Sequence, residues 1–216
     1  MTEHTKQGTG SAQGTQGNIR VWDPMVRIFH WSLVAVFTIS YLSAEGLDTI
    51  HQITGYTVAG LVAFRLIWGL VGGRYARFTQ FIKGPAAVMG YLRDMLRGRE
   101  RRYLGHNPAG AAMILALLVT LAGTAFTGWL LVDPTRVAML PDLPQFVSPA
   151  FADADGAANF GGKILKSSHE VLSNLMLLLI GLHVVGVVFA SLRHKENLAR
   201  AMVKGDKRGP GPDDIA

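Results

Sequence analysis

Four histidines are the residues of this chain with the clearest capacity for chemistry. His30, His51, His169 and His183 lie within or at the ends of long apolar segments of the 216-residue sequence. Ionisable groups in such surroundings are costly and mark functional sites, and imidazole is a common ligand of metals and of haem iron. The sequence contains no cysteine. This excludes disulfides, thiolate metal sites, iron–sulfur clusters and thiol catalysis within this chain.

The spacing of these histidines indicates two stacked pairs. His169 and His183 are 14 residues apart, which is about 21 Å along a helix and within roughly 40° of the same helix face. In helices that cross a membrane in alternating directions, His51 lies at the depth of His169, and His30 at the depth of His183. We therefore predict an outer pair, His51 with His169, and an inner pair, His30 with His183. Two imidazoles on one haem iron suit electron transfer rather than oxygen activation.

The four histidines have other interpretations besides haem binding. One intramembrane histidine alone can serve as a helix–helix hydrogen-bond partner, and His51 and His169 at helix entrances can simply contact lipid headgroups. A zinc site or a proton pathway needs further acidic or thiol groups. Apart from Glu170 at the entrance of the fourth apolar segment, the apolar segments contain no Asp, Glu or Cys. Two haems b explain four paired imidazoles better.

Residues near the histidines extend the predicted cofactor site. Gly55, one turn after His51, leaves room for a macrocycle, and Gly123 and Gly128 are expected to allow close approach along the third apolar segment.

A buried arginine and a fifth histidine have two interpretations each. Arg65, again 14 residues after His51, is either a counter-ion for a haem propionate near the inner pair or a side chain that snorkels to the headgroups. His106 either helps to line an inner quinone or propionate site or is a solvated residue at a helix start, and we favour the second. No catalytic residue is predicted.

Four apolar segments set the fold class. About 20 apolar residues cross a membrane as a helix, and the segments 26–44, 53–71, 109–132 and 171–192 meet this length in a chain that is 49% hydrophobic. We predict an all-α integral membrane protein, a bundle of four transmembrane helices with two haems between them, over residues 21–200. Residues 1–20, rich in Gly, Thr, Gln and Ser, are expected to be a disordered tail. Residues 201–216 are expected to be a second tail, and the first helix to serve as the targeting signal.

The distribution of charge predicts the orientation in the membrane. The connection of residues 72–108 carries eight basic residues and two acidic ones, whereas residues 133–168 carry three basic residues and four aspartates. Basic loops remain in the cytoplasm, so both termini are expected to be cytoplasmic, in the inner membrane of a bacterium. The net charge of +6 then indicates contact with anionic lipids rather than with nucleic acid.

The sequence resembles the bacterial cytochrome b561 family and the related b-type cytochrome subunits of nickel–iron hydrogenases. The stretches that carry the resemblance are Val21-Trp22-Asp23-Pro24, Phe29-His30-Trp31, His51-Gln52-Ile53-Thr54-Gly55-Tyr56, Arg65-Leu66-Ile67-Trp68-Gly69, Ala76-Arg77-Phe78, His106-Asn107-Pro108-Ala109-Gly110, Thr127-Gly128-Trp129, His169-Glu170 and Leu182-His183-Val184-Val185-Gly186. They occur in the family's order and cover most of the chain.

This resemblance implies four transmembrane helices and two b haems, with axial ligands at His30, His51, His169 and His183 and none from the third helix. It also implies electron exchange between a quinone, ubiquinone or menaquinone, and a second redox partner. That partner is a periplasmic cytochrome c, a hydrogenase subunit or another redox subunit. Two alternatives stay open: a superoxide:quinone oxidoreductase, and a membrane anchor subunit of a periplasmic redox enzyme.

Overall fold

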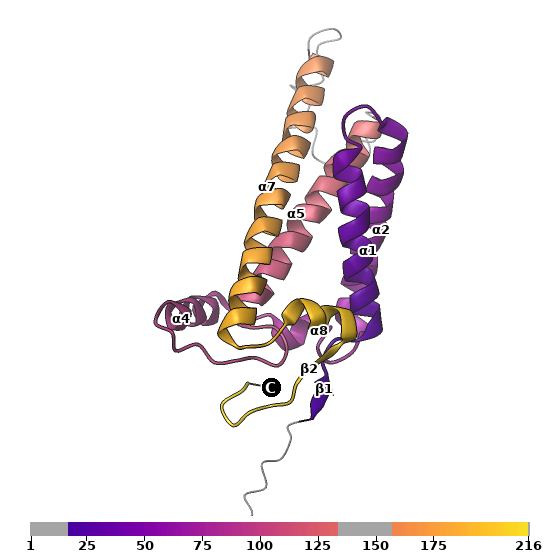
Figure 1. Cartoon of the computed structure of the whole chain (residues 1–216). Coiled ribbons are helices and arrows are strands. Elements are labelled where there is room, and N and C mark those ends of the chain that lie inside the picture. The colour runs from indigo at the N-terminus through magenta and orange to yellow at the C-terminus, as the bar shows by residue number, and fades with distance from the viewer. Residues whose placement is uncertain (1–16, 134–156, 216) are drawn as a thin grey trace, which may run out of the picture.

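Four long helices dominate the computed structural model, which describes residues 17–133 and 157–215 (Figure 1). They are α1 (Pro24–Leu42), α2 (Asp48–Val71), α5 (Pro108–Val132) and α7 (Ala157–Arg193). Each is long and apolar enough to cross a membrane. The prediction of four membrane-spanning helices is therefore confirmed by length and composition.

Helices α1 and α5 each begin after a residue whose side chain caps the helix N-terminus. Asp23 accepts a hydrogen bond from the backbone N–H of Val26 at 2.9 Å, and Asn107 accepts one from the N–H of Gly110 at 2.7 Å. A proline follows each cap at the first helical position, where its missing N–H costs nothing because that donor would have no intrahelical partner. These local signals fix the starts of α1 and α5.

The second and fourth helices extend beyond the apolar segments predicted from sequence. Helix α2 begins at Asp48 rather than at residue 53, and α7 begins at Ala157 rather than at residue 171. His51 therefore lies in the first turn of α2, while His169 lies more than three turns inside α7 rather than at its entrance. The physical reason is that hydropathy marks the apolar part of a helix, and a helix continues into polar sequence until its backbone bonding is interrupted.

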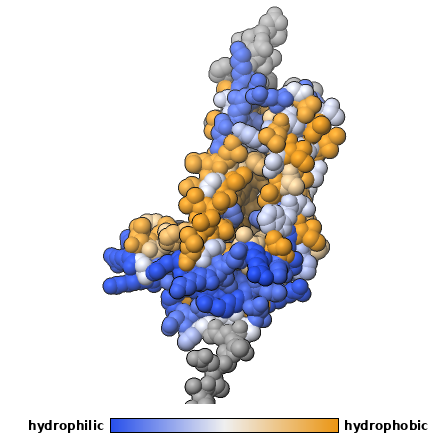
Figure 2. All heavy atoms as spheres, in the orientation of Figure 1, coloured by the Kyte–Doolittle hydropathy of each residue, from blue (hydrophilic) through white to orange (hydrophobic). Residues whose placement is uncertain are grey.

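The helices pack in sequence order: α1 lies against α2, α2 against α5, and α5 against α7. A small core of buried side chains joins α2, α5 and α7, and its members are Val58, Val62, Leu121 and Met176. Figure 2 shows apolar side chains over the outer surface of the bundle, and a hollow between α7 and α1. An apolar exterior of this kind is expected of helices that face lipid.

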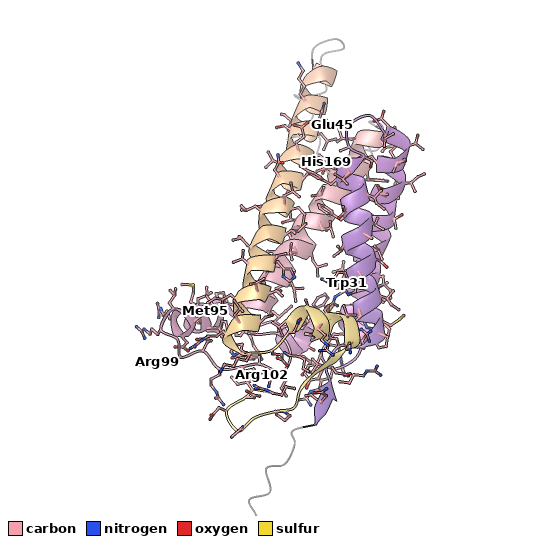
Figure 3. The ribbon with its side chains drawn as sticks, viewed as in Figure 1. Trp31, Glu45, Met95, Arg99, Arg102 and His169 are labelled. Carbon is pink, nitrogen blue, oxygen red and sulfur yellow. The ribbon has the colours of Figure 1, made fainter. Side chains whose placement is uncertain are left out.

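Short elements gather at one end of the bundle, where α1 and α5 begin and α2 and α7 end. These are α3 (Phe78–Phe81), α4 (Pro85–Leu96), α8 (Leu198–Lys204) and the strands β1 (Asn18–Arg20) and β2 (Asp206–Arg208). We call it the basic end, because the connection of residues 72–108, with its eight basic residues, lies there. Figure 2 shows a continuous band of hydrophilic side chains across it. The opposite end, where Glu45 lies (Figure 3), is the far end.

The two chain ends are more ordered than predicted. Strands β1 and β2 pair antiparallel, with Ile19 opposite Lys207, so residues 18–20 are not part of a disordered tail. Residues 1–16 lie outside the described part of the chain. The segment after residue 200 is not a free tail either, because it contains the end of α8, β2 and a backbone contact between Ile215 and Leu104. The contacts that order both segments join residues far apart in sequence, which composition does not reveal.

Candidate functional site

The outer pair meets near the far end of the bundle. His51 projects from α2 and His169 from α7 (Figure 3), and their ring centroids are 6.1 Å apart with an interplanar angle of 87°. Two imidazole nitrogens that each bond one metal ion at about 2 Å lie about 4 Å apart, with ring centres about 6 Å apart. The outer pair therefore has the spacing required to hold one metal centre between its rings.

Hydrogen bonds orient both rings of the outer pair. The Nδ1 atom of His51 is 2.8 Å from the carbonyl oxygen of Ser40. The Nδ1 atom of His169 is 3.0 Å from the carbonyl oxygen of Thr124 and 3.0 Å from the hydroxyl of Thr127. A carbonyl only accepts, so each Nδ1 carries the proton and donates it. Each Nε2 then keeps a free lone pair, which is the form that binds a metal.

Sequence reasoning missed these orienting groups. Thr120, Thr124 and Thr127 recur at one-turn spacing in α5, a signal that could have indicated a polar face. Ser40 and Thr124 contribute backbone carbonyls, which no side-chain pattern reveals. Gly128 also shapes the pair, since a Cβ atom at this position would lie 3.0 Å from Cε1 of His169. The residue that approaches Gly128 closely is therefore His169.

The inner pair lies toward the basic end. His30 projects from α1 and His183 from α7, both half-buried, and the two imidazoles interact electrostatically. The Nδ1 atom of His30 is buried and has no hydrogen-bond partner within the described residues. The layer containing Val62 and Met176 separates the two pairs along α2 and α7. The outer and inner pairs therefore lie at different levels of the bundle, with different surroundings.

Arg65 points into the protein rather than toward the headgroups. It is 4% exposed, its Nη2 donates to the carbonyl of Ala76 at 3.2 Å, and its guanidinium carbon lies 4.8 Å from the ring centre of Phe78. The snorkelling interpretation is wrong, because residues 73–78 fold back under α2 and cover the side chain. Its Nη1 is buried without a hydrogen-bond partner in the described part of the chain, which leaves one donor for an anionic group.

His106 is not the solvated helix-start residue that we favoured. Its ring lies between Trp22 and Phe81, with ring centroids 4.6 Å away on each side, and its Nδ1 is buried without a partner among the described residues. Burial, then the positive charges of Arg65 and Lys207, lower the pKa of His106 to about 3. A neutral imidazole therefore lies at the basic end, close to the inner pair.

The space beside Gly55 and the number of grouped metal ligands indicate which cofactor these residues fit. A Cβ atom at Gly55 would meet no atom within 4 Å, so the backbone there is open to a flat ring. Among the residues that the structure describes, no three His, Cys, Asp or Glu side chains are grouped to hold a metal ion. A structural zinc site needs four such ligands. Two imidazoles that share one metal fit a haem iron, whose other ligands come from the porphyrin.

A known protein family matches most of the chain. Residues 21–205 match the family model for prokaryotic cytochrome b561. The chain belongs to this family. No curated protein matches it, and no solved structure matches it. Membership in the cytochrome b561 family, together with four helices able to span a membrane, makes this chain a membrane b-type cytochrome and implies that it binds haem b.

Proposed function

We propose that this cytochrome binds two haems b and transfers electrons between a quinone and a second redox partner in the bacterial inner membrane. The outer pair carries the proposal, because its ring spacing of 6.1 Å and its Nδ1–H donors to carbonyls fit two axial ligands of one iron. His30 and His183 are the proposed ligands of the second haem. A haem held by two imidazoles gains and loses single electrons and has no open position for oxygen.

The protein's part in this function is to hold, orient and separate the two sites. The two histidines of α7 are 14 residues apart, which is about 21 Å along the helix. This spacing supports one site toward each side of the membrane. Arg65, with its free Nη1, is the proposed counter-ion of a propionate at the inner site, and Gly55 the proposed open wall of the outer site.

The haem content of the detergent-purified chain tests the proposal directly. We expect a reduced-minus-oxidised spectrum of b type and a pyridine haemochrome ratio of two haems per polypeptide. A ratio of one haem per polypeptide would mean that only one of the two proposed sites binds haem. A chain that contains no haem after expression with haem supply would overturn the proposal. Copurification of a stoichiometric redox subunit, or reduction of quinone by superoxide, would redefine the second partner without changing the sites.

We also propose that the basic end faces the cytoplasm. It contains α4, which exposes Met89 and Leu96 beside arginines, a combination that fits the surface of an anionic membrane. The chain has no cysteine, so single cysteines report on sidedness. With a membrane-impermeant maleimide on intact spheroplasts, we expect E45C to be labelled and R99C to be labelled only after permeabilisation. The reverse pattern would invert the orientation.

The hydroxyl of Thr127 offers a smaller test of the outer site. T127V keeps the side-chain volume and removes one of the two acceptors near Nδ1 of His169, while the carbonyl of Thr124 remains. A hydrogen bond donated by Nδ1–H makes the imidazole a more basic ligand, which favours the oxidised iron. We expect the outer haem's potential to rise by about 20–40 mV, the equivalent of one weak hydrogen bond. A redox titration that shows the inner potential shifting instead would contradict the assignment.

A further inference from the structure

The segment that follows α7 crosses the basic end and contacts the first two turns of α1. The indole Nε1 of Trp31 donates to the carbonyl of Met202 at 3.4 Å, and the guanidinium of Arg27 donates to the carbonyl of Val203. Trp31 is the neighbour of His30 and lies edge-on to its ring, with centroids 5.1 Å apart. Helix α8 therefore runs from the end of α7 to the start of α1, close to Trp31 (Figures 1 and 3).

Residues 205–215 continue this crossing, and we call them the strap. The carbonyl of Gly205 accepts hydrogen bonds from the backbone N–H groups of Val21 and Trp22, at 3.0 and 3.1 Å. Strand β2 then pairs with β1. At the end of the strap, the N–H of Leu104 donates to the carbonyl of Ile215 at 2.9 Å. The strap is thus bonded to the chain both before α1 and before α5.

A buried ionic cluster fastens the strap. The guanidinium of Arg102, 6% exposed, donates to both carboxylate oxygens of Glu196 at 2.9 and 3.2 Å, to the carboxylate of Asp214 and to the carbonyl of Arg208 at 2.8 Å. Burial opposes ionisation of Glu196, yet the hydrogen bond from Arg102 and the charge of Lys207 lower its pKa below the ordinary value. The cluster is therefore ionised, and it joins the α4–α5 connection, the α7–α8 turn and the strap.

Lys207 extends this cluster toward the inner site. Lys207 is buried, with 5% of its surface exposed. Its ammonium donates to the carbonyls of Leu104 at 2.9 Å and Tyr103 at 3.2 Å, and it lies 3.6 Å from the carboxylate of Glu196. These carbonyls precede His106 by two and three residues. Trp22, which flanks His106, is held by Gly205 on the other side. The strap therefore fixes both the backbone before His106 and one wall of its ring.

From these contacts we infer that Arg102, Glu196 and Lys207 are positioning residues that fasten α8 and the strap as a floor under the inner histidine pair, shielding it from water and holding His106 in place. The inference rests on the proposed dihaem function. Residues 206–215, which contain Lys207 and Asp214, lie beyond the stretch that matches the family model.

The floor has a definite electrostatic effect on the inner site. Water stabilises the more highly charged, oxidised state of a haem, and shielding from water therefore raises the reduction potential. The positive charge of Lys207 acts in the same direction, because a nearby cation favours gain of an electron. Loosening the floor is therefore expected to lower the potential of the inner haem and to leave the outer haem unchanged.

The test compares R102Q with R101Q in the full-length, detergent-purified protein. Arg101 is the adjacent arginine, and it is exposed. Its Nε donates to the carbonyl of Asp213 at 2.9 Å. We expect R102Q to shift the inner haem's redox equilibrium about tenfold toward the oxidised form, about 59 mV for one electron. Oxidation of the reduced protein by ferricyanide should become several-fold faster. R101Q should match the wild type in both measurements.

A second position keeps the inference open to refutation should R102Q fail to fold, since breaking a buried ion pair is strongly destabilising. K207Q leaves Arg102 paired with Glu196, and we expect a smaller shift in the same direction, which K207R should restore. Wild-type potentials and ferricyanide rates in K207Q would overturn the inference, and so would loss of both haems, because a floor at one end does not hold the far site. A wild-type protein without two haems would instead refute the proposed function.

Discussion

Replacing His183 with alanine is expected to remove one haem of the two and to leave the other in place. His183 belongs to the inner pair, whereas His51 and His169 of the outer pair make their own contacts, with ring centroids 6.1 Å apart and separate Nδ1 acceptors. The layer with Val62 and Met176 lies between the two sites. Removing one axial imidazole leaves its iron with a single strong ligand from the protein, so that haem should be lost on purification.

The measurement is the pyridine haemochrome ratio with the reduced spectrum at low temperature. We expect the ratio to fall from two haems per chain to about one in H183A and also in H169A, because each variant loses one of two independent sites. The two variants should lose different spectral components, which assigns each component to its site. Equal loss of both components in either variant would mean that the histidine pairing is wrong or that the two sites assemble cooperatively.

The parts of the fold that follow from sequence are those set by short-range patterns. An apolar stretch of about 20 residues specifies a membrane helix without reference to the rest of the chain. The 14-residue spacing places His169 and His183 on one face of α7 for the same reason. The start of α7 at Ala157 was not predictable in this way, because a helix that extends beyond the apolar stretch leaves no mark in hydropathy.

The parts that sequence reasoning missed depend on contacts between distant segments. Arg102 meets Glu196 and Asp214 only after the chain has crossed the bundle twice more, so nothing near residue 102 indicates that it is buried. The direction of Arg65 is decided in the same way, since Phe78 and the carbonyl of Ala76 come from the segment after α2. Charge alone could not distinguish this arrangement from snorkelling.

Adding one methyl group at Gly128 is expected to disturb the outer site selectively. A Cβ atom there would lie 3.0 Å from Cε1 and 3.5 Å from Nδ1 of His169, closer than a carbon–carbon contact at optimal separation of about 3.5–4.0 Å. The ring is held by Thr124 and Thr127 on the same helix as Gly128. It can therefore move away only by lengthening those hydrogen bonds and tilting Nε2 away from His51.

We expect G128A to weaken retention of the outer haem and G128V to abolish it, with the inner haem unchanged in both. The matched control is G123A on the same helix, where a Cβ atom would lie 3.3 Å from Cδ1 of Leu172, the end of a flexible side chain that can rotate. Replacing glycine by alanine within a helix favours the helix by roughly 0.5–1 kcal/mol. Haem loss in G128A therefore cannot be attributed to a weaker α5.

The two alanine variants together separate local crowding from a general effect on the α5–α7 interface. Crowding of His169 predicts a haem ratio between one and two in G128A and a ratio of two in G123A, because only the first methyl group faces a ring that must keep its orientation. Equal haem loss in both variants would show that close packing of α5 on α7, rather than the position of the His169 ring, controls the outer site. A ratio of two in G128V would show that the ring has room to move and that Gly128 does not position it.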